Sequence, residues 1–201
     1  GESGSGKSTS LRNLDPKETF ILGVLDKPLP FKGYKQNYTV VNKGNPTGNY
    51  IACDNYNKIL SFIDAVDKRR PEIKVLIIDD FQYLMANEFM RRALERGFDK
   101  FSEIAHHAWD MIRRLTETRP DLYCFVLSHS DTDANGKVKC KTIGKMLDDK
   151  ITLEGMFTTI FHAQVADGQY KFLTQNDGIH IAKSPMDMFS EKMIDNDLSV
   201  I

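Results

Sequence analysis

The stretch Gly1-Glu2-Ser3-Gly4-Ser5-Gly6-Lys7-Ser8-Thr9 decides how the rest of the chain is interpreted. Its fixed positions match the pattern G-x-x-x-x-G-K-[ST], in which glycines let the backbone turn tightly and point N–H groups at phosphate oxygens. Lys7 is expected to reach the β- and γ-phosphates, and Ser8 is expected to bind Mg²⁺. The motif predicts a phosphate-binding loop, for which a flexible glycine-serine turn is the alternative.

An acidic residue ends a long apolar run, Lys74 to Asp79. Such a run predicts a central parallel strand that is covered on both faces. Because ligands bind at the carboxyl ends of parallel strands, Asp79 is expected to emerge near the loop and hold Mg²⁺ opposite Ser8, in the Walker B arrangement. A helix cap is its alternative role. Together the two motifs predict a site for Mg²⁺ and a nucleoside triphosphate, with ATP as the expected cofactor.

Three further residues are candidates for the chemistry of hydrolysis. Asp80 can orient or deprotonate an attacking water, and Asp54, at the end of the predicted strand Tyr50 to Cys53, is the rival for that role. His129 follows the apolar run Leu122 to Leu127 and can sense the γ-phosphate, although a surface histidine is the alternative.

Working outward from the loop, strand and helix patterns alternate along the chain. The strongest are strands at 19–25, 74–79 and 122–127, helices at about 54–70 and 101–118, and a hairpin at 158–174 with its turn at 166–169. They predict an α/β fold: one domain over 1–201, with a mostly parallel sheet flanked by helices and a C-terminal β-hairpin. Because this loop motif normally follows a buried strand, we expect a first strand of about five apolar residues upstream of Gly1.

Weaker patterns give further expectations. Lys7 to Leu14 is expected to open a helix that stops before Pro16, and Tyr38 to Val41 is expected to form a short edge strand. The polar segment from His129 to Lys150 is interpreted as a long loop, and Asp187 to Ile201 as weakly helical.

Composition narrows the classes of partner. The 201 residues are 41% hydrophobic and 27% charged, and no stretch has the roughly 20 apolar residues of a membrane-spanning helix. The net charge of −1 means that any contact with nucleic acid has to come from a local cluster of basic residues. Two basic clusters can serve, with solvated surface charge as the alternative: Arg91, Arg92 and Arg96, and Lys137, Lys139, Lys141 and Lys145.

With these motifs in order, the chain resembles the RecA-like P-loop ATPases, in particular the short phage-type AAA proteins related to phage single-strand-annealing ATPases. The resemblance spans nearly the whole chain. Its most specific later segments are Gly144-Lys-Met-Leu, Ile151-Thr-Leu-Glu-Gly155, Thr174-Gln-Asn-Asp-Gly178 and Ala182-Lys-Ser-Pro185.

The resemblance implies a RecA-like core that forms homo-oligomers with ATP at subunit junctions and binds single-stranded DNA. By position, the first DNA loop would include Arg91, Arg92 and Arg96, and the second would run from Ser130 to about Lys150. Lys183 would reach the γ-phosphate of a neighbouring subunit. The same resemblance implies DNA recombination or replication in the cytoplasm of a phage-infected or lysogenic bacterial host, with a phage single-strand-binding protein as a further partner.

Two other functions remain open. A small-molecule kinase can use the same loop, but such kinases usually carry an Arg-rich lid, whereas the segment from His129 to Lys150 has no Arg. A non-hydrolysing nucleotide-dependent switch or partner protein is the second, because the chain lacks the Glu that recombinases usually use as the base. The expected reaction is the hydrolysis of ATP to ADP and phosphate.

Overall fold

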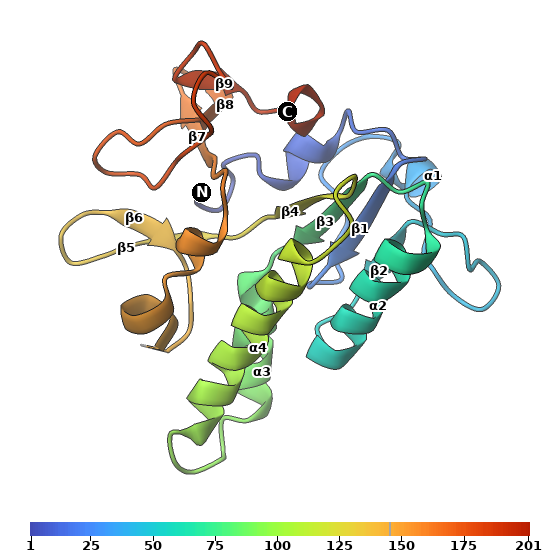
Figure 1. Ribbon diagram of the computed structural model, residues 1–201, viewed down its shortest axis with the longest axis horizontal. Helices are drawn as coiled ribbons and strands as arrows, with labels where there is room; N and C mark the ends of the chain where they lie inside the picture. The colour runs from blue at the N-terminus through green and yellow to red at the C-terminus, as the bar shows by residue number, and fades with distance from the viewer. Residues whose placement is uncertain (145) are drawn as a thin grey trace.

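A computed structural model describes residues 1–144 and 146–201, apart from the side chains of Asp148 and Asp149. A parallel four-stranded sheet in the order β2-β1-β3-β4 forms its centre (Figure 1). Its strands are β1 (Thr19–Gly23), β2 (Tyr50–Ala52), β3 (Val75–Asp79) and β4 (Tyr123–Val126). The chain is therefore an α/β protein, as the alternating pattern predicts.

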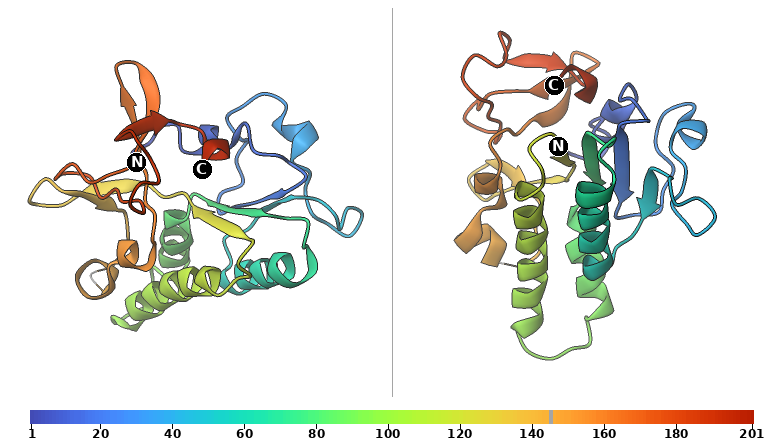
Figure 2. Two further views of the ribbon diagram at one scale, coloured as in Figure 1. Left: turned by 45° about the horizontal axis from the view of Figure 1, so that its top comes forward. Right: turned by 45° about the vertical axis from the view of Figure 1, so that its right-hand side comes forward.

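Three helices cover one face of this sheet: α2 (Tyr56–Arg69), α3 (Gln82–Arg91) and α4 (Asp99–Thr116). Alternate residues of β1 and β3, among them Phe20 and Ile78, pack against these helices. Figure 2 shows the sheet between the helices and the glycine-rich loop. On that second face Ile21 and Ile77 pack with residues of the loop segment and of the C-terminal part of the chain. The central strands are thus buried on both faces.

The C-terminal part is antiparallel. A three-stranded sheet in the order β7-β8-β9 is built from β7 (His162–Ala166), β8 (Gln169–Leu173) and β9 (Met193–Asp195). Asp167 and Gly168 form its first turn, both with positive φ, which suits a two-residue hairpin loop. The predicted hairpin is confirmed. The weakly helical ending is wrong over Met193–Asp195, because Ile194 pairs with Phe172 of β8.

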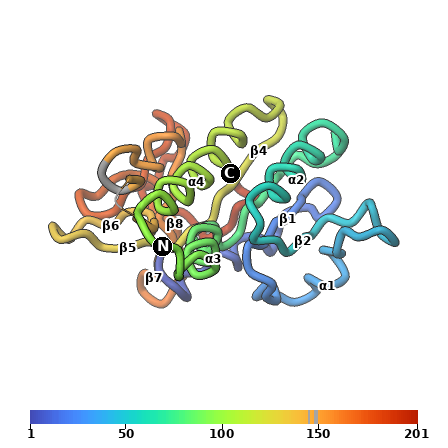
Figure 3. The backbone as a smooth tube through the Cα atoms, turned by 90° about the horizontal axis from the view of Figure 1, so that it is seen from below, coloured from blue at the N-terminus to red at the C-terminus, as the bar shows by residue number. Residues whose placement is uncertain are grey.

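The predicted long loop after β4 is also wrong in part. It contains the antiparallel hairpin of β5 (Ser130–Thr132) and β6 (Val138–Cys140) and the π-helix η2 (Leu147–Ile151), followed by the 3₁₀ helix η3 (Leu153–Met156). The side chain of Asp133 accepts hydrogen bonds from the backbone N–H groups of Asn135 and Lys137, which closes the turn. Figure 3 shows this hairpin and α1 at opposite ends of the sheet.

Two short N-terminal predictions need correction. Only Ser8–Leu11 forms a helix after the loop, the 3₁₀ helix η1, because so short a segment before Pro16 cannot offset the cost of helix nucleation. Tyr38 to Val41 forms no strand beyond a single bridge from Val40 to Tyr50. The turn α1 (Tyr34–Asn37) precedes this segment, and the backbone N–H of Thr39 donates to the side-chain oxygen of Asn49 at 2.8 Å. The last element is the 3₁₀ helix η4 (Leu198–Val200).

Helix α2 begins at a side-chain cap, Asn55. The side chain of Asn55 accepts a hydrogen bond from the backbone N–H of Lys58 at 3.1 Å. We expect Asn55→Ala to lower the free energy of unfolding by about 1 kcal/mol, measured by urea denaturation. Asn57→Ala, an exposed position in the first turn of the helix, is the matched control and is expected to leave stability within about 0.5 kcal/mol. Equal losses in both variants would contradict the cap.

Candidate functional site

The glycine-rich loop, residues 1–9, bends through two left-handed glycines, Gly4 with φ of 79° and Gly6 with φ of 89°. The C-terminal sheet packs against it. A side chain at Gly6 would lie 2.8 Å from the ring of Tyr170 and 3.1 Å from Oδ1 of Asn196, so only glycine fits there. Glycine is therefore required at Gly6 by both backbone conformation and packing.

The two predicted metal ligands meet. Ser8, at the start of η1, donates a hydrogen bond from its hydroxyl to Oδ1 of Asp79 at 3.0 Å, although 71 positions separate them. Asp79 is the last residue of β3 and is 3% exposed. Burial and the neighbouring Asp80 carboxylate raise the pKa of Asp79 above its ordinary value. The hydroxyl of Ser8 and the buried carboxylate of Asp79 are thus in direct contact beside the glycine-rich loop.

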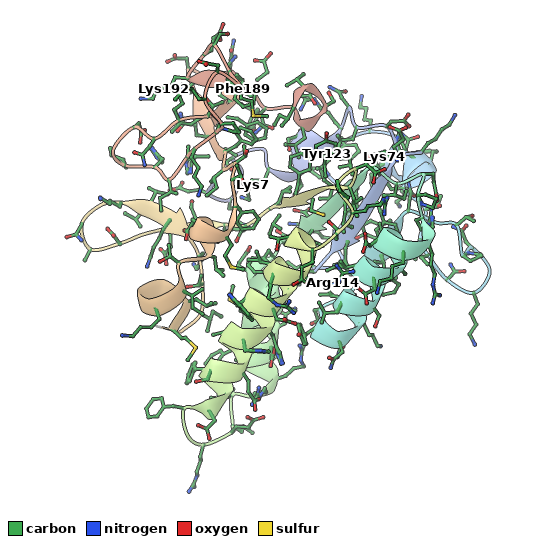
Figure 4. The ribbon with its side chains drawn as sticks, in the orientation of Figure 1. Lys7, Lys74, Arg114, Tyr123, Phe189 and Lys192 are labelled. Carbon is green, nitrogen blue, oxygen red and sulfur yellow. The ribbon has the colours of Figure 1, made fainter. Side chains whose placement is uncertain are left out.

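Lys7 lies on the same loop, toward the carboxyl end of β4 (Figure 4). Its Nζ donates hydrogen bonds to the backbone oxygens of Gly1 at 2.9 Å and Glu2 at 2.7 Å. Burial lowers the pKa of Lys7 from its ordinary value. The ammonium group is therefore held by neutral carbonyl groups, which a phosphate oxygen can replace with a stronger charge-assisted bond.

Asp80 lies beside this group in an unusual conformation. It is 3% exposed and has a φ of 61°, which is rare for a residue other than glycine. Its carboxylate forms an ion pair with Lys27, and Nε2 of His129 lies 3.8 Å from its Oδ1. The backbone N–H of Asp80 donates to Oδ1 of Asp79 at 3.0 Å. Asp80 therefore joins the predicted metal ligands to two basic side chains.

His129 follows the end of β4 and lies between these groups and the β5–β6 hairpin. Its backbone N–H donates to Oε1 of Gln82 at 3.2 Å, and its ring meets Tyr83 edge-on. Burial, with Lys7 nearby, lowers the pKa of His129, so the ring is neutral at pH 7. It can accept or donate a hydrogen bond toward Asp80.

The rival base, Asp54, has different neighbours. Its carboxylate accepts hydrogen bonds from Arg91 at 2.6 Å and Asn87 at 2.9 Å, both on α3. Among the described residues, Asp80 contacts Asp79, whereas the side chain of Asp54 contacts Asn87 and Arg91. The structure therefore separates two residues that the sequence left as alternatives.

The first basic cluster is largely paired within the chain. Arg91 binds Asp54, while Arg92 binds three carboxylates, at 3.1 Å from Glu88, 2.9 Å from Glu95 and 2.6 Å from Glu103. Arg91 also ends α3, so the predicted loop is a helix at that point. Arg96 is exposed in the turn that follows.

The second basic cluster lies on the β5–β6 hairpin. Lys137 and Lys141 are exposed, and Lys139 is in β6. Lys145 is outside the described residues. The backbone of Lys183 forms an isolated antiparallel β-bridge with Ile160, and Lys183 is half-buried. No contact among the described residues joins Lys183 to the glycine-rich loop.

Sequence reasoning missed three residues of this site. Lys27 follows the carboxyl end of β1, the neighbour of β3, so its position next to a parallel strand was the available signal. Tyr170 and Asn196 come from the C-terminal sheet, and nothing in their local sequence marks them. Both polar side-chain atoms of Asn196 are buried and have no hydrogen-bond partner in the part of the chain that the structure describes. That amide beside Gly6 can hydrogen-bond to a ligand.

Comparisons with known proteins do not assign the chain to a family. No protein-family model matches the chain, and no curated protein is similar to it at a significant level. Among the described residues, no helix has the length and apolar character needed to cross a membrane.

Proposed function

We propose that the chain binds ATP with Mg²⁺ and hydrolyses it to ADP and phosphate. The observation that carries the proposal is the 3.0 Å contact between Ser8 Oγ and Asp79 Oδ1. Mg²⁺ prefers hard oxygen ligands and is commonly held by one or two protein groups together with substrate phosphates. Ser8 and Asp79 are such a pair, so the residues fit the ion. Bound Mg²⁺ would neutralise charge on the phosphates.

The glycine-rich loop and Lys7 would hold the phosphates. Gly4 and Gly6 give the backbone the left-handed turns that concentrate N–H groups around an anion. Lys7 would exchange the carbonyl oxygens of Gly1 and Glu2 for the phosphate oxygens. The specific fold proposed is a RecA-like P-loop core, which the parallel sheet and the loop at its carboxyl edge support.

Asp80 is the residue we propose to orient the attacking water. It is buried, borders Asp79 and is already in contact with two basic groups, Lys27 and His129. A carboxylate held in place by such partners needs little rearrangement to position a water molecule. We propose Asp80 for this role because it contacts Asp79, whereas the side chain of Asp54 contacts Arg91 and Asn87 of α3.

A second part of the proposal is coupling to single-stranded DNA. The observation that favours it is the continuity from Asp80 through His129 to the β5–β6 hairpin, which carries exposed Lys137 and Lys141. A basic hairpin at the surface suits binding to a phosphate backbone without sequence preference. We propose that the protein acts in phage recombination or replication. It would do so as a homo-oligomer in which Lys183 reaches the γ-phosphate bound by a neighbouring subunit. A small-molecule kinase and a non-hydrolysing switch are the alternatives.

The deciding experiment measures release of phosphate from ATP by the protein, with Mg²⁺, in the presence and absence of single-stranded DNA. We expect turnover that requires Mg²⁺ and rises when DNA is added. Turnover that is indifferent to DNA would remove the coupling, and ATP binding without turnover would favour the switch. Phosphate transfer to a small acceptor in place of water would favour the kinase.

DNA contact by the hairpin gives a separate prediction. We expect the double variant Lys137→Ala with Lys141→Ala to weaken binding to oligothymidylate and to reduce the slope of log K against log salt by about 1.4, or about 0.7 per lost contact. Fluorescence anisotropy over a salt series measures both. Lys35→Ala with Lys43→Ala removes two exposed lysines elsewhere and is the matched control. An identical slope in both double variants would exclude the hairpin.

A further inference from the structure

Lys27 is the second lysine of the site, and it reaches the site from β1 rather than from the glycine-rich loop. The last residue of β1, Gly23, pairs with Asp79 at the end of β3. Since parallel strands end at the same edge of a sheet, the chain after β1 leaves the sheet beside the proposed metal ligand (Figure 1). There the Nζ atom of Lys27 forms an ion pair with Oδ2 of Asp80. Lys27 thus contacts the residue that follows Asp79.

The two partners of this ion pair differ in their access to water. The side chain of Asp80 is 3% exposed, whereas that of Lys27 is 43% exposed. Among the residues that the structure describes, the Lys27 ammonium group has no other ionic partner. An ammonium group has three N–H donors, and Asp80 occupies only part of them. Lys27 can therefore bind a second anion while it stays beside Asp80.

The charge of Lys27 also acts on the groups that would surround the phosphates. Burial is the main cause that lowers the pKa of Lys7, and the charge of Lys27 acts in the same direction. The pKa of His129 is lowered by burial first, then by Lys7, with a smaller contribution from Lys27. Lys7 and Lys27 repel each other, so an anion that contacts both is favourable. A phosphate group would be such an anion.

The position of Asp80 indicates which phosphate Lys27 would contact. In hydrolysis the attacking water lies in line with the γ-phosphate, on the side opposite the leaving group. Asp80, the residue proposed to orient that water, would therefore lie beside the γ-phosphate. Because Lys27 contacts Asp80, its ammonium group would lie at the same end of the nucleotide.

We propose that Lys27 binds the γ-phosphate and makes the site prefer ATP to ADP. This inference rests on the proposed function, since it places a triphosphate in the glycine-rich loop. The loop holds phosphates that ATP and ADP share, whereas Lys27 contacts the one that ADP lacks. Asp80 holds the ammonium group in place before the nucleotide binds, which reduces the entropy lost on binding.

A purely structural ion pair would behave differently. If Lys27 only neutralised the buried carboxylate of Asp80, its removal would leave that charge unpaired and lower Tm. The affinities for ATP and ADP would then change alike. The ratio of the two affinities therefore distinguishes a γ-phosphate ligand from a structural partner of Asp80.

Isothermal titration calorimetry with Mg²⁺ and either ATP or ADP measures that ratio. The reference is Asp80→Asn, which removes the buried charge and is expected to slow hydrolysis during the titration. The test variant adds Lys27→Met, so that neither charge of the ion pair remains. We expect this addition to weaken ATP binding about 10-fold or more, through the loss of a charge-assisted hydrogen bond. ADP binding is expected to change less than about twofold, because ADP lacks the phosphate that Lys27 contacts.

Two further variants complete the experiment. Lys32→Met, added to the same reference at an exposed position further along the segment, is the matched control and should change neither affinity. The single variant Lys27→Met is expected to show the same selective loss of ATP binding. Its Tm without nucleotide should also fall, because Asp80 keeps its charge in that variant.

Each other outcome overturns a distinct claim. Equal weakening for both nucleotides, or no weakening for ATP, would overturn the role of Lys27 and leave nucleotide binding by the loop in place. A lower Tm of Lys27→Met with an unchanged affinity ratio would assign Lys27 to the structural ion pair. If the unaltered chain bound neither nucleotide, the proposed function would fail, and the inference would fail with it.

Discussion

Lys7→Ala is expected to weaken the binding of Mg²⁺-ATP about 100-fold, or about 2.7 kcal/mol, because the variant loses charge-assisted bonds to two phosphates. The proposed role of Lys7 is to release the carbonyl oxygens of Gly1 and Glu2, now at 2.9 and 2.7 Å, in favour of the phosphates. Isothermal titration calorimetry with ATP and Mg²⁺ measures the change. Turnover is expected to fall at least as much, since charge builds up on the phosphates during hydrolysis.

The variant is expected to stay folded. Burial lowers the pKa of Lys7, so the charged ammonium is less favourable in the folded chain than in the unfolded one. Removing it therefore costs little stability at pH 7, and the Tm without nucleotide should stay within a few degrees. Lys17→Ala, at an exposed position after η1, is the matched control and should bind ATP normally. A Lys7→Ala protein with unchanged affinity for ATP would refute the assignment of the loop.

Sequence patterns predicted the parts of the fold that rest on long apolar periods. The runs predicted as strands over 19–25 and 74–79 contain β1 (Thr19–Gly23) and β3 (Val75–Asp79), and the periodic segment over 101–118 becomes α4, Asp99–Thr116. The contact of Ser8 with Asp79 was also predictable, because a loop motif and an acid at the end of a parallel strand meet at one edge of the sheet.

Elements that depend on tertiary partners were harder to predict. Helix α3 was missed, although Phe81, Leu84, Met85 and Glu88 repeat at helical spacing and all are buried. The β5–β6 hairpin was masked by its Lys and Asp residues, and only the Asp133 to Gly136 turn marked it. Its strands are three residues long, too short for a period of two to stand out.

Pairs of side chains from different elements had no signal in the sequence. Asp80 meets Lys27 because two neighbouring strands end together, and the left-handed conformation of Asp80 turns its carboxylate to that side. Arg92 was expected to face DNA, yet it lies among Glu88, Glu95 and Glu103. Composition counts such charges without saying which of them neutralise one another.

Asp79→Asn is expected to lower kcat for ATP by a factor on the order of 10² to 10³, because an amide cannot replace the charge of the carboxylate on Mg²⁺. The substitution keeps the shape of the side chain, and the hydroxyl of Ser8 can still donate to the amide oxygen at the position now 3.0 Å away. The half-saturating concentration of Mg²⁺ should rise, whereas binding of ATP without Mg²⁺ should change little. A series of turnover assays at increasing Mg²⁺ measures this shift.

Stability should move in the opposite direction from activity. Burial and Asp80 raise the folded-state pKa of Asp79 above its unfolded value, so the stability tied to its protonated form is full below the unfolded pKa. That stability is lost as pH rises through the folded pKa. At pH 7 without Mg²⁺ the carboxylate therefore destabilises the fold, and Asp79→Asn is expected to raise Tm there, with little difference from the unaltered chain at pH 3.

Asp131→Asn, at an exposed position in β5, is the matched control and should change neither quantity. A variant that lost turnover together with several degrees of Tm at pH 7 would assign Asp79 to the structure of the sheet edge. Unchanged turnover at every Mg²⁺ concentration would instead remove Asp79 from the metal site. Lower turnover with an equal or higher Tm is the combination that a metal ligand requires, because the buried carboxylate is stabilised by the ion it holds.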